Sequence, residues 1–466
     1  MNKKLLIGVI VLILVGGGVL FFLSFYGGGP GLQLVPKEKI SNVDISPEAA
    51  VGWSTKPDYK AAIDEAVMNA KKKLGDKVPK FAYVVYISEE NHDAIIDEIR
   101  KQIGPGVKIY GHTSNTIITN DRVIDNETFA IGVLLVVSES TAFGIGTVDQ
   151  NDYSDNSGDG GKTAILEAIK DAGKDPSIKP QMVFYMGTTM RGKESEILSG
   201  IASVIGNDVP VIGGNAKDFG PKFKNNWKQF TDKKTYDTGL MLVAVYTDKK
   251  VGWGFEATFK VTDKRGVVTK SDGFRIMEID NRPALDVYNE WVDGEFYKRL
   301  NAGEFNSDEE DVDFALVKEF TLLNPIAKIV KGPNNQIGQF ATSPIPDAQD
   351  IKDKSITVYA QVNAGDEISL YRGTWQIAMN RVETIPGDAL FRAGLQKGEG
   401  AFAIMAFCNG LKTILPAEEF QKVAAISDDI LGAPFLGAVT AGEQGPVPGI
   451  GNVNANIIES VIVIGK

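Results

Sequence analysis

The chain has 466 residues, of which 43% are hydrophobic, and carries a formal net charge of −11 at neutral pH. A chain of this size and composition buries a large core and is expected to form more than one domain or repeated unit. Its acidic balance, without a stripe of Lys and Arg between aromatic residues, argues against a nucleic-acid partner. Because Cys408 is the only cysteine, an intramolecular disulfide is excluded.

The N-terminal segment is predicted to be a membrane anchor. Residues 5–26 contain no charge and follow Lys3 and Lys4. At about 1.5 Å per residue, a helix of this length crosses a hydrocarbon core of about 30 Å. The positive-inside rule then keeps residues 1–4 in the cytoplasm and places the folded part on the extracytoplasmic side of the cell membrane. A cleaved signal peptide is the alternative, although the apolar run is longer than usual and no A-x-A site follows it.

After a flexible linker at residues 27–48, the same succession of elements occurs three times. Each set has a helix, an apolar strand, a second helix, a turn with Gly and small polar residues, and a closing strand. Apolar residues three and four apart predict the helices, and short β-branched runs predict buried strands. The predicted class is α/β, with mixed layered sheets flanked by helices and an internal repeat of three related units. The first helices are expected at 60–74, after Gly161 and at 388–395, the first strands at 81–88, 182–187 and 401–408, and the closing strands at 130–137, 240–246 and 457–464.

The residues between the second and third sets are predicted to be rich in β-structure. Alternating residues at 251–262 and 355–373 indicate two antiparallel hairpins, the second turning at 363–366. Strand character up to Ile279 gives way to a helix at Pro283, because Pro is well suited to a first helical position. The acidic run at 308–313 is expected to be a solvated loop.

The segment SGDGGKT at residues 157–163 superficially matches two ion-binding motifs. As a phosphate loop it fails, because Asn156 stands at the first Gly and no apolar strand runs into it. As a calcium loop it fails, because Leu166 occupies the position of the bidentate acid. The segment is therefore predicted to be a polar linker that caps the following helix.

The three Gly-containing turns are the candidate ligand site. Glycine lets a ligand approach the backbone, and small polar neighbours offer hydrogen-bond partners with little bulk. A carboxylate such as that of Glu443 suits an α-ammonium group, and backbone amides at the turns suit an α-carboxylate. The alternative is that the turns merely end strands. The candidate residues are Gly111, His112, Thr113, Ser114, Gly213, Gly214, Asn215, Asp218, Thr440, Gly442 and Glu443.

Cys408 ends a predicted buried strand and, with the following Asn409, completes the list of candidate ligand-binding residues. The residue is either a small buried hydrophobe or part of a pocket lining. The chain has two histidines, and His92 is expected on a helix surface. A hydrolase that uses Ser114 or Cys408 with His112 stays an alternative. A zinc site of His and Cys is excluded for want of ligands, and neither a cofactor nor another metal is expected.

The segments VPVIGGNAKD, GWG, GFRIMEIDNRPALDVYNEW, VNAGDEISLYRG, FCNG and GAVTAGEQG resemble, in order and spacing, the FIST N-terminal and C-terminal domains of prokaryotic sensory proteins. The resemblance covers about residues 50–466 and implies a FIST N-terminal domain at 49–250 and a FIST C-terminal domain at 251–466. It also implies a sensor for small ligands, with amino acids proposed. Two positions depart from the family. GHTSNT at 111–116 lacks the second Gly and the acid of G-x-S-S-x-G-E, and Leu411 and Lys412 stand where the family tends to place an Arg.

These features predict a single-pass membrane protein whose extracytoplasmic part binds an amino acid or a similar small polar metabolite and is not an enzyme. The family usually joins such domains to a kinase, cyclase or methyl-accepting region. No such output module is expected here, so a membrane signalling or transport partner would receive the signal. An extracytoplasmic hydrolase and a ligand-free envelope scaffold are the alternatives.

Overall fold

The computed structural model describes residues 13–15, 18–20, 47–125, 127–149, 152, 156–188, 193–216, 227–256, 258–304, 314–332, 337–342, 344 and 346–466. The chain divides into two units, Met1–Ile45 and Ser46–Lys466. In its described residues, the first unit forms two short antiparallel strands, β1 (Ile13–Val15) and β2 (Gly18–Leu20).

The predicted membrane anchor at residues 5–26 falls in this first unit. The residues of the run that the structure describes form β1 and β2 rather than a helix. Within the described ranges, no helix is both long and apolar enough to span a membrane. The rest of the run, and nearly all of the linker at 27–48, lie outside the described residues, so the anchor stays a prediction.

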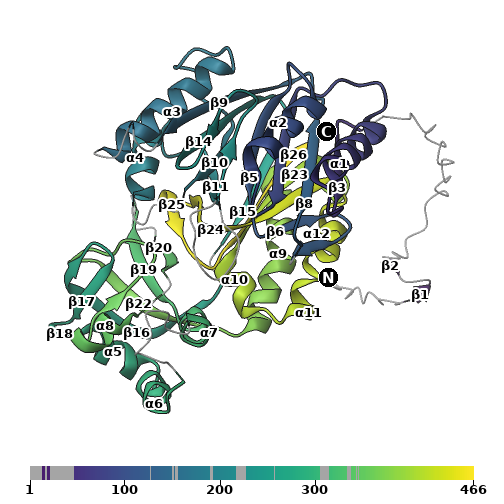
Figure 1. Cartoon of the computed structure of the whole chain (residues 1–466). Coiled ribbons are helices and arrows are strands. Elements are labelled where there is room, and N and C mark those ends of the chain that lie inside the picture. Colours follow the sequence, from purple (N-terminus) through teal and green to yellow (C-terminus); the bar gives the residue numbers. More distant parts are fainter. Residues whose placement is uncertain are drawn as a thin grey trace, which may run out of the picture. The chain divides into compact units, whose positions relative to one another are not determined.

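The second unit contains three sheets (Figure 1). The six-stranded sheet has the order β13-β12-β5-β4-β8-β3. The eleven-stranded sheet follows the path β15-β26-β23-β24-β11-β10-β14-β9, with β6, β7 and β25 attached beside β24, and the seven-stranded sheet follows β18-β17-β16-β22-β19-β20, with β21 beside β17. The bounds in the six-stranded sheet are β3 (Ala49–Ser54), β4 (Phe81–Ile87), β5 (Lys108–Thr113), β8 (Ala130–Val136), β12 (Gln229–Phe230) and β13 (Thr235–Tyr236). Those in the eleven-stranded sheet are β6 (Thr116–Thr119), β7 (Val123–Asp125), β9 (Thr141–Asp149), β10 (Met182–Gly187), β11 (Val211–Asn215), β14 (Gly239–Thr247), β15 (Val251–Phe255), β23 (Gly400–Cys408), β24 (Phe435–Val447), β25 (Gly451–Ala455) and β26 (Glu459–Gly465).

The six- and eleven-stranded sheets share one apolar core, to which Phe81 and Tyr83 of β4, Phe184 of β10 and Phe402 of β23 contribute. Helices cover the outer faces, because their apolar residues recur at helical spacing and pack on the strands. The six-stranded sheet is covered by α1 (Tyr59–Leu74) and α2 (His92–Ile103). One half of the eleven-stranded sheet is covered by α3 (Ser157–Asp171) and α4 (Glu194–Ile205). The other half is covered by α9 (Trp375–Ala393), α10 (Asn409–Ile414), α11 (Ala417–Phe420) and α12 (Val423–Leu431). The predicted class of mixed α/β layers flanked by helices is confirmed.

Three sets of four strands share one order, namely β3-β8-β4-β5, β9-β14-β10-β11 and β15-β26-β23-β24. In each set the last two strands run parallel and the other neighbours antiparallel. In each set, a glycine of the first strand also packs directly against a helix. A Cβ added to Gly52, Gly144 or Gly252 would lie 2.0–2.1 Å from a carbonyl oxygen of α1, α3 or α9. The first strand and a helix thus meet backbone to backbone in all three sets.

The prediction of a polar linker at residues 157–163 is wrong, because these residues form the first turns of α3. The side chain of Asn156 caps this helix by accepting a hydrogen bond from Asp159 N. The glycines allow α3 and α4 to approach closely, since a Cβ on Gly161 would lie 2.2 Å from Ile197 O. Close helix packing therefore explains the glycine-rich sequence.

Both predicted hairpins are wrong. In the first, β15 pairs with β26, whereas β16 (Lys260–Asp272) pairs with β17 (Arg275–Ile279) and β22 (Glu367–Arg372). In the second, β21 (Ile356–Thr357) pairs with β17, and β22 pairs with β16 and β19 (Ile326–Lys331). The predicted turn at 363–366 is confirmed, because Asp366 N donates to Asn363 O at 3.0 Å. Alternation marks a strand but does not identify its partner.

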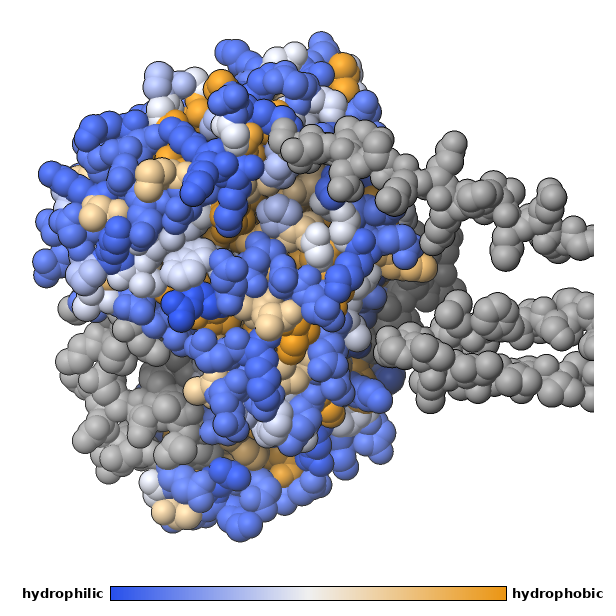
Figure 2. All heavy atoms as spheres, turned by 90° about the vertical axis from the view of Figure 1, so that its right-hand side faces the viewer, coloured by the Kyte–Doolittle hydropathy of each residue, from blue (hydrophilic) through white to orange (hydrophobic). Residues whose placement is uncertain are grey.

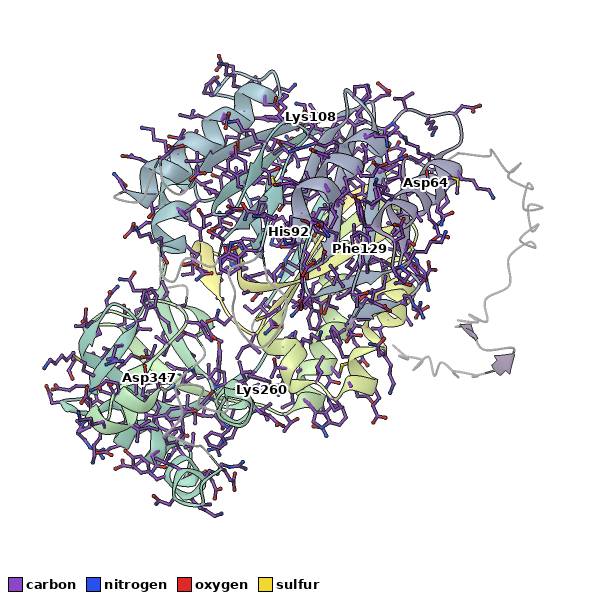
Figure 3. All side chains as sticks on the ribbon, in the orientation of Figure 1. Asp64, His92, Lys108, Phe129, Lys260 and Asp347 are labelled. Carbon is purple, nitrogen blue, oxygen red and sulfur yellow. The ribbon has the colours of Figure 1, made fainter. Side chains whose placement is uncertain are left out.

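The seven-stranded sheet is inserted in the chain between β15 and α9 and has an apolar core of its own. The chain enters it along β16 and leaves along β22, which pair at Lys260 and Arg372. Figure 3 labels Lys260 and, within this part, Asp347. The predicted helix at Pro283 is confirmed by α5, and the acidic run at 308–313 lies outside the described residues. The remaining elements are β18 (Arg282–Pro283), β20 (Ile337–Thr342), α5 (Ala284–Trp291), α6 (Glu295–Asn301), α7 (Phe314–Leu323) and α8 (Ala348–Asp353).

Candidate functional site

The three predicted turns are strand ends rather than loops. Thr113 ends β5 and Asn215 ends β11, whereas Thr440 and Glu443 lie inside the long strand β24. The ends are equivalent in register, because Thr113, Asn215 and Thr440 are each the last paired residue beside the preceding parallel strand. The candidate residues therefore lie at the carboxyl ends of parallel strands, the usual position of ligand sites in α/β sheets.

The three strand ends meet around β24. Asn215 of β11 pairs with Ala441 across an antiparallel ladder, and a Cβ added to Gly214 would lie 2.5 Å from Thr440 Cβ. Ser114, which follows β5, donates from Oγ to Val439 O at 2.8 Å. Residues from all three predicted segments thus converge, although Asp218 lies outside the described residues.

Glu443 is fully buried at this meeting point. Thr440 Oγ1 donates to Glu443 Oε1 at 2.9 Å, and the thiol of Cys408 lies beside the carboxyl group. Oε2 has no hydrogen-bond partner among the described residues. Burial raises the pKa of Glu443 to about 8, and burial together with the nearby Glu443 raises the pKa of Cys408 far above its usual value. At neutral pH both groups therefore hold their protons.

A strained backbone residue lies beside this pair. Ile457 has a φ of 59°, in the left-handed region that costs a β-branched residue roughly 1–2 kcal/mol. Its N–H donates to Cys408 Sγ at 3.2 Å, and its carbonyl oxygen accepts from Thr258 Oγ1. Strain of the kind found at Ile457 is typical of functional sites. Gly442, next to Glu443, has a φ of 73°, which glycine adopts without strain.

Three side chains outside the list of predicted residues, those of Glu194, Gln444 and Asn454, lie beside Asn215 or Gly442. Asn215 Nδ2 donates to Glu194 Oε1 at 3.2 Å, and Gln444 Nε2 donates to Asn454 Oδ1 at 2.8 Å. Asn215 Oδ1 and Gln444 Oε1 have no partner in the part of the chain that the structure describes. Buried polar atoms are nearly always satisfied by protein, water or ligand. Unused acceptor oxygens of Asn215 and Gln444 thus lie near Gly442, whereas Glu443, which precedes Gln444 in the ladder with β25, points to the other face of the strand.

His112 is fully buried, and both ring nitrogens have partners. Nδ1 donates to Thr113 O at 2.8 Å, which leaves Nε2 to accept from the Tyr83 hydroxyl at 2.9 Å. Burial lowers the pKa of His112 to about 4, so the ring is neutral. Neither nitrogen bonds Ser114 or Cys408, so His112 is not placed to act as a base for either side chain.

The prediction that His92 lies on a helix surface is wrong. Its side chain is 7% exposed, and its Nδ1 lies 2.8 Å from the Tyr86 hydroxyl, which β4 places beneath α2 (Figure 3). His92 begins α2, and the first turn of a helix that packs on a sheet is covered from below. Its charged neighbours in the sequence therefore gave a misleading signal.

Two cavities lie near the strand ends. A polar groove of about 450 Å³ lies between α4, β19 and β25, and Asn454 connects it to the cluster by bonding Gln444. A second cavity of about 400 Å³, at the start of α2, is lined by Asn91, His92, Asp93, Ala94 and Lys228. The candidate ligand-binding residues predicted from the three turns line neither of these cavities. Residues 189–192 and 217–226, which follow β10 and β11, lie outside the described residues.

Comparisons with known proteins address the family. The FIST N domain model matches residues 82–282 and the FIST C domain model matches residues 284–446. A search of the curated proteins found no match. Among solved structures, cyanuric acid hydrolase from A. caulinodans is 11% identical with a TM-score of 0.33, over 90% of this chain and 100% of that one. PurLQS from Thermotoga maritima is 8% identical with a TM-score of 0.19, over 90% and 72%.

Scores this low do not establish a shared fold with either structure, so neither informs the function of this chain. The two domain models, in contrast, together span most of the sequence and agree with the order of the six motifs. The chain belongs to the FIST family.

Proposed function

We propose that this protein binds an amino acid or a similar small polar metabolite at the ends of β11, β23 and β24. The proposal agrees with the family, because FIST domains are sensory, ligand-binding domains of signalling proteins. In this proposal the ammonium group of the ligand faces Glu443. The observation that carries the proposal is the fully buried Glu443, whose Oε2 has no partner among the described residues.

The chemistry of these groups favours a cationic hydrogen-bond donor. An ammonium group donates hydrogen bonds and carries a positive charge, and Glu443 Oε2 is an oxygen that protein groups leave unused. A buried carboxyl group with an unused oxygen is costly to the folded protein, and a charged partner removes that cost. The strained backbone at Ile457 fits a site shaped for binding rather than for stability alone.

We further propose that the protein is not an enzyme. The hydrolase alternative needs a base for Ser114 or Cys408, and His112 is held by Tyr83 and Thr113 instead. The scaffold alternative calls for a large exposed apolar face. On the face shown in Figure 2, hydrophilic residues dominate and apolar ones form small separate patches. Both features favour a binding protein.

The proposal extends to the cellular arrangement. The apolar run at residues 5–26 would anchor the protein in the membrane with the FIST domains on the extracytoplasmic side, and a membrane signalling or transport partner would receive the signal. The internal repeat of three units also stays a prediction, supported by the common strand order and by a glycine in each first strand, Gly52, Gly144 or Gly252, that packs against helix backbone.

A thermal-shift screen of the full-length protein against amino acids and related metabolites tests the binding function. A ligand at 100 times its dissociation constant stabilises the folded state by about 2.7 kcal/mol, which gives a measurable shift. Glu443→Gln should abolish the shift. The matched control is Asp350→Asn, another fully buried carboxyl group that lies in the seven-stranded part, and it should retain the shift. An equal shift in wild type and Glu443→Gln would place the ligand elsewhere.

A further inference from the structure

Gln229 is a fully buried side chain that neither the motifs nor the proposed ammonium site uses. Both of its amide atoms, Oε1 and Nε2, have no hydrogen-bond partner among the described residues. Leaving one buried polar atom unsatisfied costs roughly 1–3 kcal/mol, so a buried carboxamide with two such atoms needs an explanation.

The position of Gln229 is set by the short strand β12. Gln229 lies directly opposite His112 in the antiparallel pair β12–β5, so both side chains are on the same face of the sheet. His112 bonds Tyr83, a residue of the core between the two large sheets. Gln229 therefore points into the space between the sheets, at the end where the candidate residues lie.

Trp227 lies on the same face, two residues earlier. Lys228 and Thr113 extend the pairing, because Thr113 N donates to Lys228 O at 3.0 Å and Lys228 N donates to Thr113 Oγ1 at 3.0 Å. Trp227 packs in the core between the sheets and is 8% exposed. Its Nε1 also has no partner in the described part of the chain. Alternate residues of a strand are about 7 Å apart, so one ligand group can meet both side chains.

This pair adjoins the ammonium site through Ser114. The Lys228–Thr113 pairing places Trp227 next to Ser114, whose hydroxyl donates to Val439 O at 2.8 Å. Val439 immediately precedes Thr440, whose hydroxyl donates a hydrogen bond to Glu443 Oε1. These contacts lead from Trp227 to the predicted ammonium site, and Gln229 lies two residues from Trp227 on the same face of the strand.

The three atoms define a hydrogen-bonding pattern. Gln229 Nε2 and Trp227 Nε1 are donors, and Gln229 Oε1 is an acceptor. A primary carboxamide matches this set, because its oxygen accepts two hydrogen bonds and its NH₂ group donates to an acceptor alongside. A carboxylate has no proton to donate, so it would leave Gln229 Oε1 facing another oxygen. An apolar group would leave all three atoms unsatisfied.

We infer that Gln229 and Trp227 form a subsite for a carboxamide, so that the ligand is an amino acid whose side chain ends in one. The inference rests on the proposed function, since Glu443 receives the ammonium group of the same ligand. Asparagine and glutamine are the simplest molecules with both groups. Discrimination against aspartate and glutamate then depends on Gln229 Oε1.

Calorimetric titration of the full-length protein with glutamine, asparagine, glutamate, aspartate and methionine tests the inference. We expect at least one carboxamide amino acid to bind about tenfold or more tightly than its carboxylate counterpart and than methionine, because an unsatisfied buried acceptor costs roughly this factor. Gln229→Met removes both amide atoms at similar volume and should reduce the preference to about twofold or less. Trp227→Phe, which loses one donor, should weaken carboxamide binding and leave methionine binding nearly unchanged. The matched control Gln102→Met, on the half-buried face of α2, should bind as wild type does.

The unfolding of each variant distinguishes loss of binding from loss of the fold. Gln229→Met should unfold at a higher temperature than wild type without ligand, because it removes an unsatisfied buried amide. Amino acids that bind without a carboxamide preference would overturn this inference and leave the proposed function intact. Failure of every amino acid to bind would overturn both.

Discussion

Ile457 donates its backbone N–H to Cys408 Sγ at 3.2 Å while held at a φ of 59°, a conformation that β-branched residues rarely adopt. The sulfur therefore acts as an acceptor toward the backbone and lies beside the carboxyl group of Glu443. Both contacts are buried, and Cys408 itself is 4% exposed.

The thiol should be inert in the folded protein. Burial raises the pKa of Cys408, which suppresses the thiolate that reacts with disulfide reagents. We expect no labelling by an aromatic disulfide at mildly alkaline pH, and full labelling of the one cysteine in guanidinium chloride. Rapid labelling of the folded protein would reveal an activated nucleophile and favour the hydrolase alternative.

Ligand binding should be coupled to proton release from Glu443. Its pKa of about 8 keeps the group protonated at neutral pH, and an ammonium ligand stabilises the ionised form. Affinity should therefore rise by about tenfold per pH unit below pH 8 and level off above it. Calorimetry in buffers of different ionisation enthalpy measures the released proton. Binding that is independent of pH over this range would contradict the assignment of Glu443.

Glu443 and His112 should give opposite slopes of stability against pH. Because the pKa of Glu443 is raised from 4.5 to about 8, its contribution to the free energy of unfolding falls as pH rises through that window. Because the pKa of His112 is lowered from 6.5 to about 4, its contribution falls as pH drops from 6.5 to 4, by about 3 kcal/mol in all.

Urea unfolding at several pH values, compared between wild type and the variants Glu443→Gln and His112→Gln, separates the two slopes. The stability of Glu443→Gln relative to wild type should increase with rising pH, and that of His112→Gln should increase with falling pH. Parallel curves for a variant and wild type would show that the residue does not change its protonation between the folded and unfolded states.

The glycines of the first strands should be intolerant of any side chain. In Gly252→Ala the new Cβ would lie 2.1 Å from Ala389 O of α9, so we expect a loss of several kcal/mol or failure to fold. Gly387 is the control, because it lies inside the same helix and a Cβ there would meet only Ile430 Cγ2 at 3.9 Å. Gly387→Ala should stabilise the protein by about 0.5–1 kcal/mol. Equal melting temperatures for the two variants would contradict this packing.

Local signals predicted helices and strands well and strand pairing poorly. The period of apolar residues in α1 is a property of that segment alone, and the helix predicted at 60–74 is found at Tyr59–Leu74. The helix expected at 388–395 begins thirteen residues earlier, at Trp375, because Pro386 suggests a break that tertiary packing tolerates. The pairing of β15 with β26 joins segments at opposite ends of the C-terminal half, which no local pattern reveals.

The sequence predicted those parts of the candidate site that lie in segments of Gly and small polar residues. The segments around Asn215 and Thr440 contain Gly and small polar residues, and their convergence on β24 follows from the parallel strand ends. Glu194 and Asn454 lie in ordinary helix and strand sequences, so nothing local distinguishes them. Gln229 could have been noticed, because in WKQF a polar residue shares the inward face of a strand with Trp227.

The chain passes into and out of the seven-stranded part through one pair of neighbouring strands, β16 and β22. Adjacent strands are about 5 Å apart, so this pair can act as a single hinge. On the other side, Asn456 N donates to Ala341 O at 3.0 Å, and Asn456 immediately precedes the strained Ile457. The orientation of the seven-stranded part therefore bears on the backbone beside Cys408 and Glu443 through this one hydrogen bond.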